Sequence, residues 1–321
     1  MRARQLAAAL VGLCLALPVW ADVPADALQW LYRVTAAARK LTYTGTFIYQ
    51  SGSNTETSRI THLVQGGNEI ERIEVLDGSP REVLRVNDEV KCFLPETHLL
   101  IVERRSSSGH AFPALLPASL TGLTEHYDIR KGAISRVAGF ESQAILIEPK
   151  DDLRYGHRFW IDTRSGLLLK AELLNEHGDP IETFSFTELR IGGPIDRKAL
   201  EARPDKVGND WKMVNVHTTR GDDNQWLFNA PLAGFRKVIG MRRQIRPDMP
   251  EMTHIVFSDG LAAFSVFIEP VAATKPEIGQ FAMGTVNIYK RIADNHLLVV
   301  MGDLPPASLK KIADGMEMKK K

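Results

Sequence analysis

The pattern of apolar and polar residues predicts one helix followed by a long series of short strands. Between Pro24 and Lys40, apolar side chains such as Leu28 and Leu31 recur at helical spacing. Beyond Leu41, short segments rich in β-branched and aromatic residues alternate with turn signals such as Asp-Gly and Ser-Gly. We expect strands at 43–49, 59–64, 69–76, 83–86, 90–94, 99–102, 127–130, 134–137, 143–148, 157–161, 167–174 and 181–189. This series predicts a large, curved antiparallel sheet.

One apolar segment, 112–120, interrupts the series of strands. It contains two prolines and fits no strand, so we expect a short helix or a packed lid over the sheet. A curved sheet with a helix on its concave side makes an apolar pocket. The candidate pocket residues are Trp30, Phe47, Phe93, Phe112, Leu115 and Leu116. An ordinary hydrophobic core would use the same residue types, so both interpretations stay open.

A polar stretch at 192–210, rich in Gly, Pro and Asp, predicts a linker between two domains. The large domain is then 22–191 and the small domain 211–321. In the small domain we expect a strand at 214–217, an irregular segment at 226–234, a strand or short helix at 235–241, hairpins at 254–268 and 285–301, and a helix at 307–316. The alternating apolar residues of 264–268 are expected to face the core.

The first residues, 1–21, predict a cleaved secretory signal peptide. Arg2 and Arg4 precede an apolar run, and Val19 and Ala21 stand at the −3 and −1 positions of a cleavage pattern. Leu13 before Cys14 argues against lipidation. The mature chain is therefore expected to begin at residue 22 and to act outside the cytoplasm.

Composition and charge exclude several classes of protein. With 44% hydrophobic and 25% charged residues, the chain suits a folded, globular protein rather than a disordered one. Without Arg2 and Arg4 it keeps 38 basic and 39 acidic residues, which gives no field for general nucleic-acid binding. Cys92 is the one cysteine of the mature chain, so an internal disulfide is excluded. It is either an inert strand residue, or a thiol that is reactive or forms an intermolecular disulfide.

No catalytic motif stands out in the sequence. Nucleophile elbows, zinc-protease motifs, paired cysteines and phosphate loops are missing, and we predict no catalytic residue, metal or cofactor. An enzyme whose site forms only in space is a remaining alternative. The segment Met241-Arg242-Arg243 is a candidate surface for an acidic partner, because arginines pair well with carboxylates. A solvated strand edge is the competing interpretation.

Several motifs together resemble the RseB/MucB family, the periplasmic regulators of the sigma-E envelope-stress pathway. Their order and spacing hold across nearly the whole mature chain. The motifs are 43–49 (YTGTFIY), 81–86 (REVLRV), 154–159 (RYGHRF), 162–170 (DTRSGLLLK), 174–178 (LNEHG) and 257–270 (FSDGLAAFSVFIEP).

The resemblance implies an α+β fold, with a large LolA/LolB-like half-barrel of antiparallel strands and helices and a smaller C-terminal α/β domain. It implies binding to the periplasmic domain of a membrane anti-sigma factor of the RseA/MucA type, which is shielded from regulated proteolysis. It further implies release by a lipid or lipopolysaccharide-like ligand, and it leaves a homo-oligomer open. A periplasmic lipid or lipoprotein carrier is the alternative, although such a carrier does not need the second domain.

Overall fold

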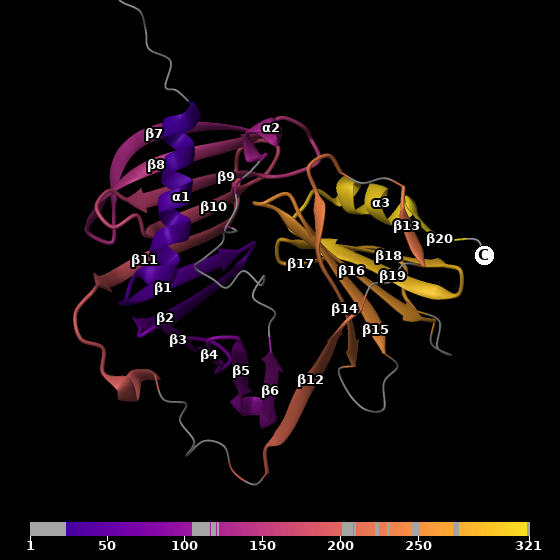
Figure 1. Cartoon of the computed structure of the whole chain (residues 1–321), viewed down its shortest axis with the longest axis horizontal. Coiled ribbons are helices and arrows are strands. Elements are labelled where there is room, and N and C mark those ends of the chain that lie inside the picture. Colours follow the sequence, from indigo (N-terminus) through magenta and orange to yellow (C-terminus); the bar gives the residue numbers. More distant parts are fainter. Residues whose placement is uncertain are drawn as a thin grey trace, which may run out of the picture.

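The computed structural model describes residues 24–104, 116, 120, 122–200, 208, 210–221, 225–229, 232–244, 251–271 and 276–319. The predicted signal peptide and two candidate pocket residues, Phe112 and Leu115, lie outside these ranges. Figure 1 shows a large domain, with a curved sheet crossed by helix α1, beside a smaller domain that carries α3. No helix within the described ranges is long and apolar enough to cross a membrane.

The large domain begins with helix α1 (Pro24–Lys40), whose bounds are those predicted. Its strands are β1 (Tyr43–Ser51), β2 (Asn54–Gln65), β3 (Asn68–Val75), β4 (Glu82–Val86), β5 (Glu89–Leu94), β6 (Leu99–Arg104), β7 (Tyr127–Val137), β8 (Phe140–Pro149), β9 (Gly156–Asp162), β10 (Leu168–Leu174) and β11 (Pro180–Ile191). They pair antiparallel in the order β6-β5-β4-β3-β2-β1-β11-β10-β9-β8-β7. Short connecting helices are η1 (Pro95–Thr97), α2 (Leu123–His126) and η2 (Arg197–Leu200).

One face of this sheet, the inner face, packs against α1. Side chains alternate across a strand, so every second residue points to this face. Tyr43, Phe47 and Ile60 do so, and they are buried against Leu31 and Val34 of the helix. Their burial on one face is what fixes the register of the strands.

The prediction of two separate strands at 127–130 and 134–137 was wrong, because β7 is continuous. The ladder between β7 and β8 shifts its register between Lys131 and Ile134, as in a β-bulge. Gly132 lies in this bulge, where a Cβ atom would come within 2.5 Å of Leu146. The side chain of Gln143 donates a hydrogen bond to the Gly132 carbonyl at 2.7 Å. The glycine therefore marks a bulge rather than the end of a strand.

The small domain is a second antiparallel sheet covered by α3 (Pro306–Asp314). Its strands are β12 (Lys212–Arg220), β14 (Arg236–Gln244), β15 (Met252–Ser258), β16 (Ala263–Pro270), β17 (Gly279–Met283), β18 (Val286–Ala293) and β19 (His296–Gly302). Strands β15 and β16 form the predicted hairpin, and the expectation that Phe264, Val266 and Ile268 face the core is confirmed.

Two parts of the small domain differ from the sequence-based expectation. Residues predicted to be irregular contain strand β13 (Trp226–Phe228), which pairs with β20 (Met316–Met318). The last helix correspondingly ends at Asp314, two residues earlier than expected. The partner of β13 lies far away in the sequence, so no local pattern indicates the pairing between β13 and β20. The second difference is strand β17, which was not predicted.

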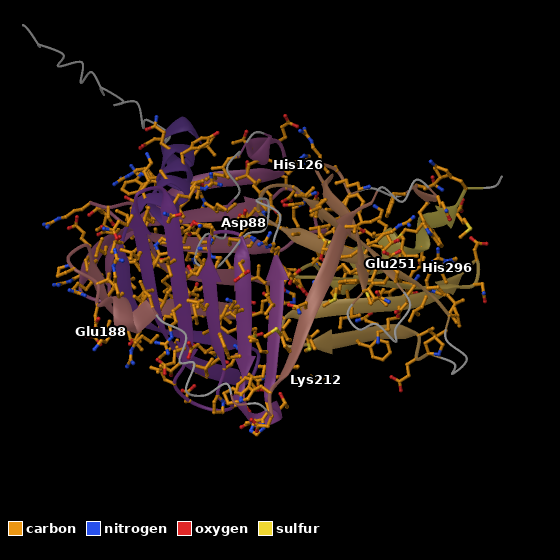
Figure 2. The ribbon with its side chains drawn as sticks, turned by 60° about the horizontal axis from the view of Figure 1, so that its bottom comes forward. Asp88, His126, Glu188, Lys212, Glu251 and His296 are labelled. Atoms are coloured by element: carbon orange, nitrogen blue, oxygen red, sulfur yellow. The ribbon has the colours of Figure 1, made fainter. Side chains whose placement is uncertain are left out.

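Strand β12 connects the two sheets. Lys212–Val216 pairs parallel with β6 of the large domain, and His217–Arg220 pairs antiparallel with β14 of the small one. Figure 2 shows this strand running from Lys212, beside the large sheet, toward the small domain. Before it, the backbone carbonyl of Ala199 accepts a hydrogen bond from Arg72. The predicted α+β fold is confirmed, whereas the exact domain boundary stays a prediction.

Candidate functional site

An apolar row runs along the inner face of the large sheet and continues past its core. The ladder places these residues opposite one another: Ile60, Ile73, Val83, Cys92, Ile101 and Val214. Ile60 is fully buried, whereas the later members of the row are only half-buried. We call this row the inner wall. Half-buried apolar side chains of this kind can contact an apolar ligand.

A polar row runs parallel to the inner wall on the same face. It begins with Tyr43, followed by His62, Glu71 and Arg85 on successive strands. The ring of His62 stacks on Tyr43 and lies 2.9 Å from a carboxylate oxygen of Glu69. His62 and Arg85 together lower the pKa of Glu69 to about 2. Burial raises the pKa of Glu71, although Arg85 opposes this effect.

The structure separates the predicted pocket residues into two faces of the sheet. Phe47 and Leu116 lie together in the packed core, and Trp30 of α1 packs against it with the guanidinium of Arg33 4.3 Å from its ring. Phe93 points to the opposite, outer face, where its ring contacts Trp211. Phe93 thus does not line a cavity with Phe47. Sequence reasoning missed the inner wall, because the half-buried members of its row become neighbours only through the ladder.

The three residues predicted to bind a partner all lie on β14 but have different surroundings. Met241 is half-buried, while Arg242 is exposed, with an amino group 3.8 Å from Glu251. Arg243 is turned toward the large domain, where it donates a hydrogen bond to Glu103 of β6 at 2.6 Å. Arg243 therefore links the two domains, and only Arg242 presents its charge to solvent.

His254 completes the contact at Arg243. Arg243 donates to its Nδ1 atom at 3.3 Å, so Nε2 carries the proton and donates to the Ser265 hydroxyl at 3.0 Å. Burial and the neighbouring guanidinium lower the pKa of His254 to about 4. This histidine is consequently neutral near pH 7.

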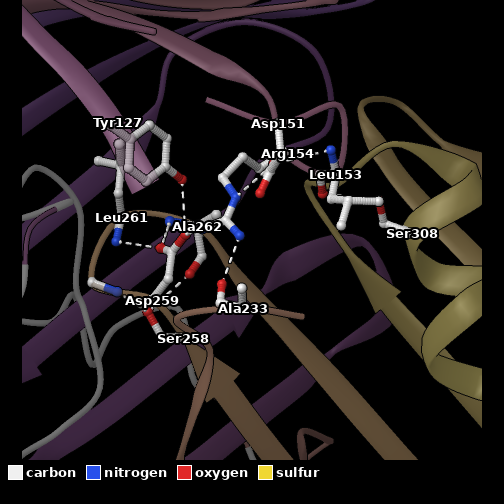
Figure 3. A network of polar contacts seen from close by, with 11 residues as sticks. Tyr127, Asp151, Leu153, Arg154, Ala233, Ser258, Asp259, Leu261, Ala262 and Ser308 are labelled. Carbon is white, nitrogen blue, oxygen red and sulfur yellow. Dashed lines mark hydrogen bonds and ion pairs between the residues drawn. The ribbon is translucent and has the colours of Figure 1, made fainter. Parts of the chain in front are cut away.

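A buried ion pair joins the domains at a second place (Figure 3). Arg154, between β8 and β9, donates to Asp259 in the β15–β16 turn at 2.7 Å, and both side chains are fully buried. The Tyr127 hydroxyl donates to the same carboxylate at 2.9 Å. Arg154 also donates to the Ala233 carbonyl at 2.7 Å and to Asp151 at 3.0 Å. Each charge is thus paired and hydrogen-bonded, as a buried charge must be.

The turn itself holds Asp259 in place. Its second carboxylate oxygen accepts hydrogen bonds from the backbone N–H groups of Leu261 and Ala262, both at 2.9 Å. Arg154 also lies over the ring of Phe235, 5.1 Å from its centre. The hairpin that contains the Asp259-Gly260 turn was predicted, but the role of this turn in joining the domains was not, because Arg154 lies 105 residues earlier in the sequence.

A third contact between the domains lies beside a cavity of about 430 Å³. The cavity is lined mainly by uncharged polar groups and by glycine: Gln50, Gly52, Tyr155, Pro180, Ile181, Thr183, Gly284, Thr285 and Asn287. Thr285 of the small domain donates to Glu182 of the large domain at 2.7 Å. In the described part of the chain, no three His, Cys, Asp or Glu side chains come together as metal ligands would.

The fold and these contacts define a class: a two-domain α+β protein with a half-barrel, an apolar inner wall and buried charges between its domains. The MucB/RseB N-terminal domain matches residues 26–204, and the MucB/RseB C-terminal domain matches residues 220–317. The chain belongs to the MucB/RseB family.

Characterised relatives cover nearly the whole chain. The Sigma factor AlgU regulatory protein MucB of Pseudomonas aeruginosa is 30% identical over 322 residues, which span 95% of this chain and 94% of the relative. The Sigma-E factor regulatory protein RseB of Haemophilus influenzae is 25% identical and spans 92% of each chain. A crystal structure of MucB in complex with MucA(peri) has a TM-score of 0.71 and 28% identity, covering 92% of this chain and 100% of that one.

We expect Asp259→Ala to lower the free energy of unfolding by about 3–5 kcal/mol, because it leaves the Arg154 charge buried without its partner. Urea denaturation of the mature protein measures this. Glu148→Ala is the matched control, since it removes an exposed ion pair with Arg130 and should cost less than about 1 kcal/mol. A loss as small for Asp259→Ala as for the control would contradict the structural role of the pair.

Proposed function

We propose that this chain is a periplasmic negative regulator of a sigma-E-type stress response. It binds the periplasmic domain of a membrane anti-sigma factor of the MucA/RseA type and shields that domain from regulated proteolysis. One observation carries the proposal. Both domains of the chain match MucB as it is found in a solved complex with MucA(peri), over 92% of this chain. The relatives are named as sigma factor regulatory proteins, not as enzymes.

We further propose that a lipid-like ligand releases the anti-sigma factor, and the inner wall supports this part of the proposal. An acyl chain laid along the wall would cover half-buried side chains such as Val83, Ile101 and Val214. Each methylene removed from water contributes about 0.8 kcal/mol, so a partial chain gives micromolar binding.

The wall alone would equally suit a lipid or lipoprotein carrier, which is the second candidate. The small domain distinguishes the two candidates. A carrier gains nothing from a second sheet that is fixed to the first by a buried ion pair and a shared strand, β12. Detectable affinity for the anti-sigma factor is therefore the property that separates the regulator from the carrier.

The surface of β14 supplies a place for an acidic segment of the partner. Arg242 presents its guanidinium there, and the carboxylate that pairs with it among the described residues, Glu251, is itself exposed at a distance of 3.8 Å. Such a contact is weak in water and can exchange for a partner's carboxylate at little cost. Arg243 contributes indirectly, because it holds β14 against Glu103.

We expect Arg242→Ala to weaken binding of the purified periplasmic domain of the anti-sigma factor by about two- to fivefold, the effect of one charge at the rim of an interface. Isothermal titration calorimetry measures the affinity. Arg236→Ala is the matched control, because Arg236 is an exposed arginine at the other end of the same strand. Equal affinities of the two variants would reject this surface, whereas no binding by the unmutated protein would reject the regulatory function.

Cys92 gives a direct probe of the inner wall. Its thiol is free and half-buried within the wall, and burial raises its pKa. We expect a bound long-chain amphiphile to slow alkylation of Cys92 at pH 8.5 at least fivefold, because the chain covers the thiol. Mass spectrometry follows the alkylation over time.

The control for this experiment keeps the thiol but moves it to the other face of the same strand. In the double variant Cys92→Ala with Lys91→Cys, the thiol points to the outer face. Its alkylation should not change when the amphiphile is added. Equal protection at both positions, or at neither, would contradict binding along the inner wall.

A further inference from the structure

Two carboxylates, one from each domain, meet at the third interdomain contact. Glu182 belongs to β11 of the large domain, and Asp303 follows β19 of the small domain. The hydroxyl of Thr285 donates to Glu182 at 2.7 Å. One carboxylate oxygen of Asp303, Oδ1, is buried and accepts no hydrogen bond from the described residues. A buried carboxylate oxygen without a donor is costly as long as the group is ionised.

The backbone around these carboxylates is closely fitted. The Thr285 N–H donates to the hydroxyl of Ser51, in the β1–β2 hairpin, at 3.1 Å. Gly284 has a φ of +62°, and a Cβ atom on it would lie 2.6 Å from the same hydroxyl. Nearby, Asn287 donates to the hydroxyl of Tyr155 at 3.3 Å. The turn before β18 thus docks into the large domain with little space to spare.

The negative charge of Glu182 disfavours the ionised form of Asp303. Asp303 also interacts with Tyr49 and Tyr155 of the large domain, which are uncharged near neutral pH because burial raises the pKa of each hydroxyl. Within the described ranges, neither Glu182 nor Asp303 forms an ion pair with a lysine or arginine. This distinguishes the contact from the Arg154–Asp259 pair, in which the charges are balanced.

We propose that this contact is a proton-dependent clasp between the two domains. A proton on Asp303 removes the repulsion between the two carboxylates and turns the unpaired oxygen into a hydroxyl that can donate. Ionisation of both groups weakens the clasp and lets the turn before β18 move away from the β1–β2 hairpin. The inference does not depend on the identity of the partner or the lipid.

The direction of the pH effect follows from where the proton is held more tightly. Burial and Glu182 raise the pKa of Asp303 from 3.8 to about 6 in the closed contact, and Thr285 opposes the shift. The stabilisation by the proton is therefore complete below about pH 3.8 and is lost as the pH rises through about 6. Between pH 7.5 and pH 5 the closed form should gain roughly tenfold in population relative to the open form.

Hydrogen–deuterium exchange of the mature protein tests the clasp. The readout is protection of peptides covering 49–54 and 283–288, corrected for the intrinsic pH dependence of exchange. We expect roughly tenfold greater protection at pH 5 than at pH 7.5. Asp303→Asn, which stays neutral, should give the higher protection at both pH values, and Glu182→Gln should reduce the pH dependence without abolishing it.

Asp294→Asn is the matched control, because Asp294 is an exposed aspartate in the β18–β19 turn of the same domain. It should keep the wild-type response, and thermal melts show whether each variant is folded. The proposal is overturned if the wild type shows no pH dependence or if Asp303→Asn keeps it. If Asp303→Asn does not fold, an unchanged pH response in Glu182→Gln overturns it instead.

Discussion

The fully buried ion pair between Arg154 and Asp259 is the interaction on which the arrangement of the two domains depends. Two charges without solvent are tolerated only when each is paired and hydrogen-bonded. The protein meets this condition with Tyr127, Asp151, the Ala233 carbonyl and two backbone N–H groups of the β15–β16 turn. These groups come from both domains, so the pair is satisfied in one relative placement only. Moving the domains apart would expose Arg154 and Asp259 to water or leave each charge without its partner.

Strand β12 also restricts how the two domains can be placed, because its backbone runs through both sheets. Because its first half belongs to the ladder of β6 and its second half to that of β14, the sheets share a continuous backbone. Val214, on this strand, is also the last member of the inner wall. A ligand that covers the wall therefore touches the strand that carries the small domain. This gives the lipid-like ligand proposed above a physical route to a surface in the other domain.

Local features were predictable from the sequence, and long-range ones were not. The helix at 24–40 and the hairpin at 254–268 were correct because spacing and turn residues are local signals. The β13–β20 pairing and the Arg154–Asp259 pair join distant segments that carry no local sign of each other. Phe93 could not be assigned to a face, since alternation within one strand does not say which face is the inner one.

The adjacent arginines Arg242 and Arg243 are a second case in which the sequence does not show which face of the sheet a side chain occupies. Neighbouring residues of a strand point to opposite faces, so Arg242 and Arg243 could not both meet one partner surface. In the structure Arg242 is exposed to solvent, whereas Arg243 donates a hydrogen bond to Glu103. The sequence indicated the charge of the segment correctly. The division of roles between the two residues depends on β6, which is 140 residues away from Arg243.

Protection of the anti-sigma factor from cleavage is the most direct measure of the central claim. The measurement follows proteolysis of its periplasmic domain by the protease that starts regulated cleavage, with and without the purified mature protein. The account predicts that saturating protein slows cleavage strongly and that an added lipid-like amphiphile restores it. Cleavage at the same rate with and without the protein would contradict the account.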